Sequence, residues 1–444
     1  MHRITHLTFL VVFTTLATAS IASDWPQWLG QNRDSVWKEE GLLEKFPKGG
    51  PKVLWRVPVG LGYAGPTVAN GRVYVMDYQK TGGKIANNPG NRDKLEGSER
   101  LLCLDAKTGE EIWKHDYDRL YSLSYAAGPR CTPAIDNGRV YALGAEGDLI
   151  CLDADNGKVI WKKNLQKEYK IRSGTWGFSG HPLVDGETVY CLVGGEGSVA
   201  VAFDKNTGVE KWRALTASSG DPGYCPPSMI TNHGKKQLLI WHPQALNGLD
   251  PETGKVQWSL PLKPAFNLSC ASPRQSGDRL FVSAIGDVAV MLKLKSIDAV
   301  ETEWVATPKS GVFCSNSTPV FDGDVIYGCD VESSKLIAVN AEDGERYWET
   351  AKPVTNNDSE KLRHGTSFLV KNGDRYFIFS ETGDLIIAKL SPKAYEEISR
   401  FRMLEPTNEA FGRSVVWSHP AFAEKCVFAR NDKELVCVSV AKRE

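Results

Sequence analysis

A unit that reads as four short β-strands recurs along the chain, and it limits the fold more than any other feature. It is clearest where apolar runs at residues 140–143, 149–152 and 159–161 are separated by glycine-containing turns. Residues 132–135 supply a further strand before the Asn137-Gly138 turn, because Asn-Gly provides the positive φ angles of a tight hairpin. The unit is therefore a four-stranded antiparallel meander that ends in a tryptophan.

Eight copies of this unit follow one another between Gly65 and the C-terminus. The tryptophans that close the first six copies are Trp113, Trp161, Trp212, Trp258, Trp304 and Trp348. The seventh copy is degenerate, with Phe401 in place of tryptophan, and the eighth ends after its third strand. Trp258 and Trp304 are 46 residues apart, a period typical of propeller blades. We predict an all-β fold, an eight-bladed β-propeller of four-stranded antiparallel blades, with seven blades as the alternative if the seventh copy is not a blade.

The fourth strand that the last copy lacks is found at the other end of the chain. A strand from Val53 to Val59 precedes the first copy and contains Trp55. Pairing of this strand with the last copy closes the ring and leaves no open sheet edge, which would invite association. The repeated tryptophans are interpreted as packing between neighbouring blades, and the Asp-x-x-Thr-Gly elements as turns.

The region before the ring divides into two parts. Residues 1–22 carry an apolar run from Leu7 to Leu16 followed by small residues, which predicts a cleaved secretory signal peptide. Residues 23–51 hold four large aromatic residues and are expected to be irregular chain packed on the propeller of residues 52–444. The first cysteine is Cys103, so no lipid anchor is expected. The mature protein is predicted to be soluble and exported, to the periplasm or beyond the cell, with no membrane span.

Charge and cysteine usage exclude some classes of partner. The formal net charge is −1, so no basic surface for nucleic acid is indicated. The protein is expected to be a monomer. Cys103, Cys151 and Cys437 occupy one position in the third strand of three copies, which is typical of free, buried thiols. The ten cysteines include no adjacent pair and no Cys-x-x-Cys, and their pairing stays open.

The function is expected on the face that carries the long loops. The turns between first and second strands are short, whereas the links between blades are long, and the stretch from Gln79 to Arg100 is interpreted as a solvated surface loop. Residues just before each first strand should ring the central channel on this face. The candidate ligand-binding residues are Arg130, Cys131, Trp176, His181, Asn316, His364, Arg413, Trp417 and His419.

Three interpretations of this ring stay open: a structural role at a crowded position, a polar pocket with an aromatic rim for a small ligand or a partner's peptide, and a metal site. The histidines and cysteines come from different blades and match no familiar ligand spacing, so no metal is predicted. The chain has no Gly-x-Ser-x-Gly, no His-Glu-x-x-His, no phosphate loop and no dinucleotide fingerprint, so no catalytic residue is assigned.

The repeat itself resembles a known family. Residues 104–113 (Leu-Asp-Ala-Lys-Thr-Gly-Glu-Glu-Ile-Trp) and 152–161 (Leu-Asp-Ala-Asp-Asn-Gly-Lys-Val-Ile-Trp) are similar to the blades of pyrroloquinoline-quinone-like (PQQ-like) β-propeller proteins, the quinoprotein alcohol dehydrogenase-like superfamily. The resemblance runs from about Lys52 to the C-terminus. It implies one of two kinds of protein: periplasmic dehydrogenases that hold PQQ and Ca²⁺ over the axis, or non-catalytic scaffolds such as the propeller of the outer-membrane β-barrel assembly machine.

The chain departs from both branches. It lacks the vicinal cysteines typical of the dehydrogenases and the anchoring cysteine of the assembly lipoprotein. The leading hypothesis is an exported, non-catalytic binding or scaffold protein that uses the long-loop face, with no firmly predicted cofactor. The first alternative is a PQQ- and Ca²⁺-dependent dehydrogenase of the alcohol type, in which Trp176 or Trp417 would be the flat aromatic under the quinone. The second is a propeller that binds carbohydrate or metal.

Overall fold

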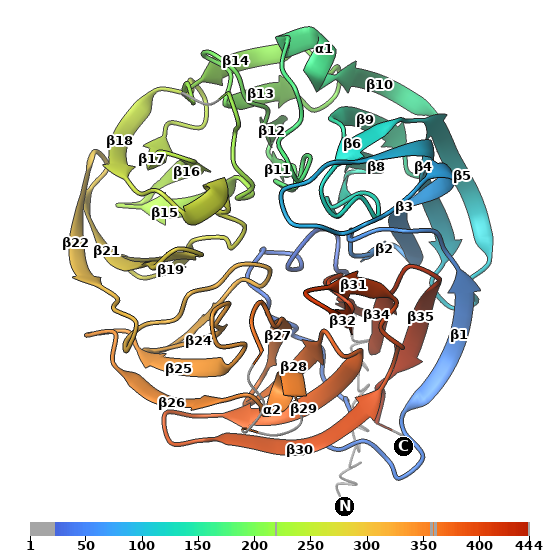
Figure 1. The fold of residues 1–444 in the computed structure, drawn as a ribbon, viewed down its shortest axis with the longest axis vertical. Helices are drawn as coiled ribbons and strands as arrows, with labels where there is room; N and C mark the ends of the chain where they lie inside the picture. The colour runs from blue at the N-terminus through green and yellow to red at the C-terminus, as the bar shows by residue number, and fades with distance from the viewer. Residues whose placement is uncertain (1–22, 218–219, 356–357, 359–361, 443–444) are drawn as a thin grey trace, which may run out of the picture.

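The strands form eight antiparallel blades around a central axis (Figure 1). This computed structural model describes residues 23–217, 220–355, 358 and 362–442, so the predicted signal peptide lies outside the described residues. The predicted all-β, eight-bladed propeller is confirmed, and the degenerate seventh copy is a complete blade. In each blade the first strand lies nearest the axis, and the fourth lies at the outer edge.

The first four blades follow the first four copies of the repeat. Their strands are β2 (Thr67–Ala69), β3 (Arg72–Gly83), β4 (Asp93–Asp105) and β5 (Glu111–Asp118); β7 (Ala134–Asp136), β8 (Arg139–Leu143), β9 (Asp148–Asp153) and β10 (Val159–Asn164); β11 (Leu183–Asp185), β12 (Thr188–Leu192), β13 (Ala200–Asp204) and β14 (Glu210–Ala214); and β15 (Ser228–Asn232), β16 (Lys235–His242), β17 (Ala245–Leu249) and β18 (Val256–Pro261).

The other four blades complete the ring. Their strands are β19 (Arg274–Ser276), β20 (Arg279–Ala284), β21 (Val288–Ser296) and β22 (Ala299–Val305); β23 (Val320–Asp322), β24 (Val325–Cys329), β25 (Leu336–Asn340) and β26 (Arg346–Thr350); β27 (Ser367–Asn372), β28 (Arg375–Ser380), β29 (Asp384–Leu390) and β30 (Tyr395–Arg402); and β33 (Ala421–Ala423), β34 (Cys426–Arg430), β35 (Glu434–Ser439) and β1 (Lys52–Pro58).

A few short elements lie between or beside the blades. They are β6 (Tyr121–Leu123), the hairpin β31 (Asn408–Ala410) and β32 (Arg413–Val415), the helices α1 (Leu165–Tyr169) and α2 (Lys352–Thr355), and a 3₁₀ turn at Ala265–Asn267. Among the described residues, no helix has the length and apolar character needed to cross a membrane.

The ring is closed by strands from the two ends of the chain, as predicted. Strand β1 pairs antiparallel with β35, with Trp55 opposite Cys437, and the two strands lie side by side in Figure 1. The residues before β1 extend this contact, because the backbone N–H of Leu43 donates to the carbonyl of Val440 at 2.7 Å. The last blade is therefore built from both ends of the propeller sequence, and it joins the start of the ring to its end.

The repeated tryptophans hold each blade to the next, which confirms the packing interpretation. In six blades the indole N–H donates to a backbone carbonyl of the following blade: Trp55 to Ala106, Trp113 to Ala154, Trp161 to Lys205, Trp212 to Pro251, and Trp304 to Ala341, all at 3.0 Å, and Trp348 to Ser391 at 2.7 Å. All six acceptors lie in the turn between the third and fourth strands, so these turns, three of which have the sequence Asp-x-x-Thr-Gly, are the binding sites for the indoles.

The glycines of these turns are required by the close approach of the rings. A Cβ atom at Gly157 would lie 2.6 Å from the Trp113 ring, and one at Gly208 would lie 2.7 Å from Trp161. Both glycines also have φ near +70°, a conformation that glycine adopts without strain. Phe401 meets an equivalent residue, since a Cβ atom at Gly50 would lie 2.4 Å from its ring.

One part of the sequence interpretation is wrong. The stretch from Gln79 to Arg100 is not mainly a solvated loop, because β3 and β4 stay paired as far as Gly83 opposite Leu95. Tyr78 and Leu95 are buried in a small apolar cluster, and Tyr78 stacks on Tyr121 of β6 with ring centroids 4.0 Å apart. The alternating charged residues on the other face conceal this hairpin in the sequence.

The cysteines follow the sequence interpretation. All ten are free thiols, and nine of them are buried, including Cys103, Cys151 and Cys437. Each of these three lies inside a third strand, opposite the aromatic ring of the fourth strand of its own blade. They therefore act as small apolar side chains in the blade cores.

Replacement of Trp113 tests the contact between blades. Trp113→Ala should lower the free energy of unfolding by about 3–5 kcal/mol, because it leaves a cavity beside Gly157. Trp113→Phe keeps most of the ring and loses the hydrogen bond to Ala154, so it should cost about 1 kcal/mol. Urea denaturation measures both, with the exposed Val209→Ala as a control expected to stay within about 0.5 kcal/mol. Equal losses for the two Trp113 variants would contradict a packing role.

Candidate functional site

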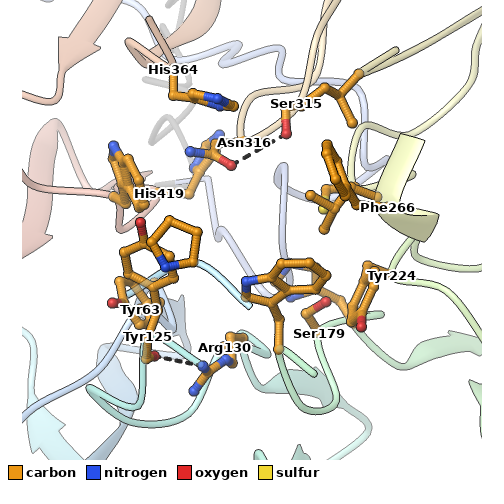
Figure 2. A pocket seen from close by; sticks show the side chains of 18 of the residues that line it. Tyr63, Tyr125, Arg130, Ser179, Tyr224, Phe266, Ser315, Asn316, His364 and His419 are labelled. Carbon is orange, nitrogen blue, oxygen red and sulfur yellow. Dashed lines mark hydrogen bonds between the residues drawn. The ribbon is translucent and has the colours of Figure 1, made fainter. Parts of the chain in front are cut away.

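A cavity of about 480 Å³ occupies the central channel on the long-loop face. It is lined mainly by segments that precede the first strands of the blades, so all eight blades contribute to it. Figure 2 shows labelled side chains from these segments, among them Tyr63, Tyr224, Phe266 and His419, arranged around a common space. A volume of this size suits a small organic ligand.

Seven of the nine candidate residues line this cavity. They are Arg130, Trp176, His181, Asn316, His364, Trp417 and His419. Their position follows from the repeat, because equivalent residues of equivalent blades occupy equivalent places around the axis. A role of these side chains in ligand binding stays a prediction.

The two other candidates do not reach the cavity. Cys131 is fully buried, and its Sγ lies 3.5 Å from the carbonyl oxygen of Phe178. Successive side chains of extended chain point to opposite sides, so Arg130 faces the channel and Cys131 faces the blades. Arg413 lies on β32 and pairs with Glu381 at 2.8 Å, outside the cavity lining.

Several lining residues were missed by the sequence analysis, and most of them are aromatic. They are Trp28, Tyr125, Tyr224, Phe266, Phe368 and Phe411. Tyr125, Phe266 and Phe411 lie on irregular links between blades and have positive φ angles, which no repeat alignment predicts. Trp28 belongs to the N-terminal segment, where the Trp25-Pro-Gln-Trp28 sequence was the available signal.

The N-terminal segment closes the inner end of the channel. Residues 25–37 contact the first strands towards their turn ends: Trp25 bridges Val68, and the N–H of Trp37 donates to the carbonyl of Lys371 at 2.8 Å. Arg274 of β19 fixes the segment by donating to the carbonyls of Arg33 and Asp34 at 2.6 and 2.8 Å. The segment runs near the centre of the ring in Figure 1. The cavity is therefore a pocket with one open end, and Trp28 is part of its floor.

Two histidines near this floor have defined tautomers. The N–H of Thr132 donates to Nδ1 of His181 at 2.9 Å, so the remaining proton of neutral His181 is on Nε2. Nδ1 of His419 lies 2.8 Å from the carbonyl oxygen of Pro420, which only accepts, so Nδ1 carries the proton and Nε2 is bare. The pocket thus has one imidazole that donates and one that accepts.

Burial keeps both imidazoles neutral. Desolvation lowers the pKa of His419 to about 4. Desolvation, with a smaller contribution from the Arg33 cation, lowers the pKa of His181 well below its ordinary value. The His181 ring also stacks on Trp28 with centroids 4.5 Å apart, which fixes its orientation.

The open end of the pocket has an aromatic rim. The rings of His364 and Phe411 stack with their centroids 4.2 Å apart, and the ring centroids of Tyr125 and Trp417 are 6.0 Å apart. Glu381, which is 1% exposed, accepts hydrogen bonds from Trp417 Nε1 at 2.9 Å and from Arg413 Nε at 2.8 Å. Arg413 therefore contributes indirectly, because it pairs with the carboxylate that positions the Trp417 ring.

The pocket contains little charge. Among its described lining residues none is Asp or Glu, and Arg130 is the one side chain with a formal charge. Arg130 stacks over Tyr63 at 5.3 Å and donates to the carbonyls of Ser124 and Tyr125 at 2.9 and 2.6 Å, and also to that of Gly128. Much of its donor capacity is used to hold the loop before β7.

This lining does not fit PQQ and Ca²⁺. Calcium is bound in proteins by about six to eight oxygen ligands, among which carboxylates supply the negative charge. The lining offers hydroxyls of Thr132, Ser179 and Ser315 and the amide of Asn316 but no carboxylate. In the described part of the chain, no three His, Cys, Asp or Glu side chains converge as a metal site.

Comparison with known proteins gives a family and a fold. The family model described as outer membrane protein assembly factor BamB matches residues 97–350. Among solved structures, BamB from Moraxella catarrhalis is 16% identical, with a TM-score of 0.57, and the match covers 88% of this chain and 98% of that one. No curated protein sequence matches the chain at a significant level.

Two dehydrogenase structures are about as similar to this chain as BamB is. A quinohemoprotein alcohol dehydrogenase from Comamonas testosteroni is 14% identical with a TM-score of 0.58, over 95% of this chain and 81% of that one. A europium-containing methanol dehydrogenase is 14% identical with a TM-score of 0.56, over 94% of this chain and 89% of that one. At these identities the likeness shows the fold alone.

Protonation of His419 should make the protein less stable in acid. Its folded pKa of about 4 lies below the ordinary value of about 6.5, so between these values the unfolded chain binds more protons. The contribution of neutral His419 to the free energy of unfolding is fully present above pH 6.5. It falls by about 3 kcal/mol as the pH approaches 4. His419→Gln should remove this part of the pH dependence, as measured by urea denaturation at pH 7.5 and 4.5. If the free energy of unfolding falls equally between pH 7.5 and 4.5 in the unmodified protein and in His419→Gln, His419 does not contribute to the pH dependence.

Proposed function

Because the chain belongs to the PQQ-like propeller family whose model is described as outer membrane protein assembly factor BamB, we propose that it is a non-catalytic binding protein. In this proposal the binding surface is the long-loop face, and the axial pocket is the ligand site. Family membership supplies the blades, whereas function depends on the residues that the loops place over the axis.

The observation that carries the proposal is the lining of the pocket. It combines nine Trp, Tyr and Phe side chains with three histidines and no carboxylate. Aromatic faces supply large apolar contact area, and a few polar groups fix orientation, as in small-molecule binding sites. No Asp or Glu among the described lining residues offers a carboxylate base, and burial lowers the pKa of His181 and His419, which makes them weak bases, so we favour binding over catalysis.

The proposal includes the setting in which the protein acts. An N-terminal signal peptide would export the chain to the periplasm or beyond the cell as a soluble monomer. The small net charge, the lack of a helix that could cross a membrane in the described residues, and the relation to BamB support this setting.

A second candidate function is docking of a partner protein over the mouth of the pocket. Phe266 is 72% exposed and Phe411 is 46% exposed, and both lie at the rim. Exposed aromatic side chains of this kind are typical anchors of protein interfaces. The two candidates differ in depth: a small ligand would contact Trp28 at the floor, whereas a docked protein would depend on Phe266.

A screen for ligands tests the first candidate. A library of uncharged and charged ring compounds and small sugars is screened by ligand-observed NMR against the mature protein and against Trp176→Ala. Compounds that use the pocket should bind the Trp176→Ala variant at least about tenfold more weakly, because a stacking partner is lost. Val209→Ala serves as the control. Val209 lies directly before the outer strand β14 of the third blade, and this variant should bind the same compounds with unchanged affinity. Hits that bind the unmodified protein and Trp176→Ala with equal affinity would contradict the proposal.

A further inference from the structure

We infer that the axial pocket takes an uncharged, planar ring compound whose edge carries one hydrogen-bond acceptor and one donor. This inference rests on the proposed function and specifies the ligand of the same site. It is carried by the fixed protonation of the two imidazoles near the floor and by the charge and polarity of the walls around them.

The imidazoles define the edge of the ligand. Nδ1 of His181 is occupied by the Thr132 N–H, and Nδ1–H of His419 is occupied by the Pro420 carbonyl. Neither Nε2 atom has a hydrogen-bond partner among the residues that the structure describes, so both are open to a ligand: Nε2–H of His181 requires an acceptor, and bare Nε2 of His419 requires a donor. Each ring is held in place, His181 by stacking on Trp28 and His419 by contacts with Trp25 and Phe368.

The walls define the body of the ligand. Trp176, Trp417 and Tyr63 come from three different segments of the ring and offer faces and edges to a flat molecule. Aromatic pairs are attractive when the rings are offset or perpendicular at about 4.5–7 Å, so a flat ring ligand can gain from contact with these side chains. Trp176 is already set perpendicular to Tyr224, with centroids 5.6 Å apart.

The charge of the lining excludes ionic ligands as the best fit. A cation would find no carboxylate among the described lining residues and would be repelled by Arg130. An anion would have Arg130 alone, whose guanidinium already binds three backbone carbonyls, and two neutral imidazoles. A neutral ligand leaves no buried charge without a partner.

The small number of polar side chains excludes ligands with many polar groups. A peptide brings a donor and an acceptor with each residue, and a sugar brings several hydroxyls, all of which need partners when they are buried. The side-chain hydroxyls and amide of the lining are those of Thr132, Ser179, Ser315 and Asn316, beside the tyrosines. A ring with two polar atoms on one edge matches this supply better.

Four compounds with one bicyclic skeleton test the inference. They are 2-quinolone, which has a ring N–H and a carbonyl; N-methyl-2-quinolone, which lacks the donor; quinoline-2-carboxylate, an anion; and N-methylquinolinium, a cation. Isothermal titration calorimetry of the mature full-length protein at pH 7.5 gives their dissociation constants. The same titrations are made with His419→Phe, which removes the accepting nitrogen, and with His115→Phe, a matched change on the outer strand β5.

The expected order is specific. 2-Quinolone should bind most tightly, and N-methyl-2-quinolone should bind about tenfold more weakly because His419 Nε2 then has no donor. His419→Phe should abolish this difference, whereas His115→Phe should retain it. The two charged compounds should bind at least tenfold more weakly than 2-quinolone.

Two results would overturn the inference. Tighter binding of either charged compound in a manner sensitive to Trp176→Ala would show that the ligand class is wrong while the pocket remains a binding site. Failure of all four compounds to bind would exclude flat bicyclic ligands of this kind, and the proposed function would then be judged by the wider screen alone.

Discussion

The contact between a tryptophan and the glycine turn of the following blade is the interaction on which the ring depends. An indole buries a large apolar area against the neighbouring sheet, and its N–H donates to a backbone carbonyl in the turn of that sheet. The glycine is required on the other side, because any Cβ at Gly109, Gly157, Gly208 or Gly254 would overlap the ring. One contact therefore combines apolar packing, hydrogen bonding and steric selection, and its repetition fixes the angle between successive blades.

Three contacts depart from this pattern, and they show which part of it varies. The fifth blade has lost the Asp-Gly turn, and Trp258 instead donates to Gln237 Oε1 at 2.8 Å, while Gln237 Nε2 donates to the carbonyl of Ile297 in the turn of that blade, also at 2.8 Å. The glutamine thus relays the hydrogen bond across a longer distance. In the seventh blade Phe401 has no N–H but still packs on Gly50. The turn of the seventh blade has no glycine, yet Trp348 still donates to the carbonyl of Ser391 there at 2.7 Å. The aromatic ring on the fourth strand is thus present in every blade, whereas the glycine and the direct hydrogen bond are each absent from some contacts.

A ring held together at its outer strands leaves its inner strands free to vary. The first strands are three residues long in six of the eight blades, and the segments before them carry Tyr63, His181, Asn316 and His364 into the channel without disturbing the packing between blades. This separation explains how one family includes an assembly factor and shares its fold with dehydrogenases. The residues over the axis, and not the blades, decide what such a protein binds.

The sequence by itself determined the blades, their number, the closure by a strand from the N-terminal side and the positions that face the channel, because all of these follow from a local pattern that repeats. It placed seven of nine candidate residues at the cavity and failed for Cys131, where alternation along extended chain reverses the side on which neighbours point. Only the tertiary structure decided that Trp28 closes the pocket, that Phe266 and Phe411 rim it, and that His181 and His419 hold opposite tautomers. These features depend on contacts between segments far apart in the chain, for which no local spacing exists.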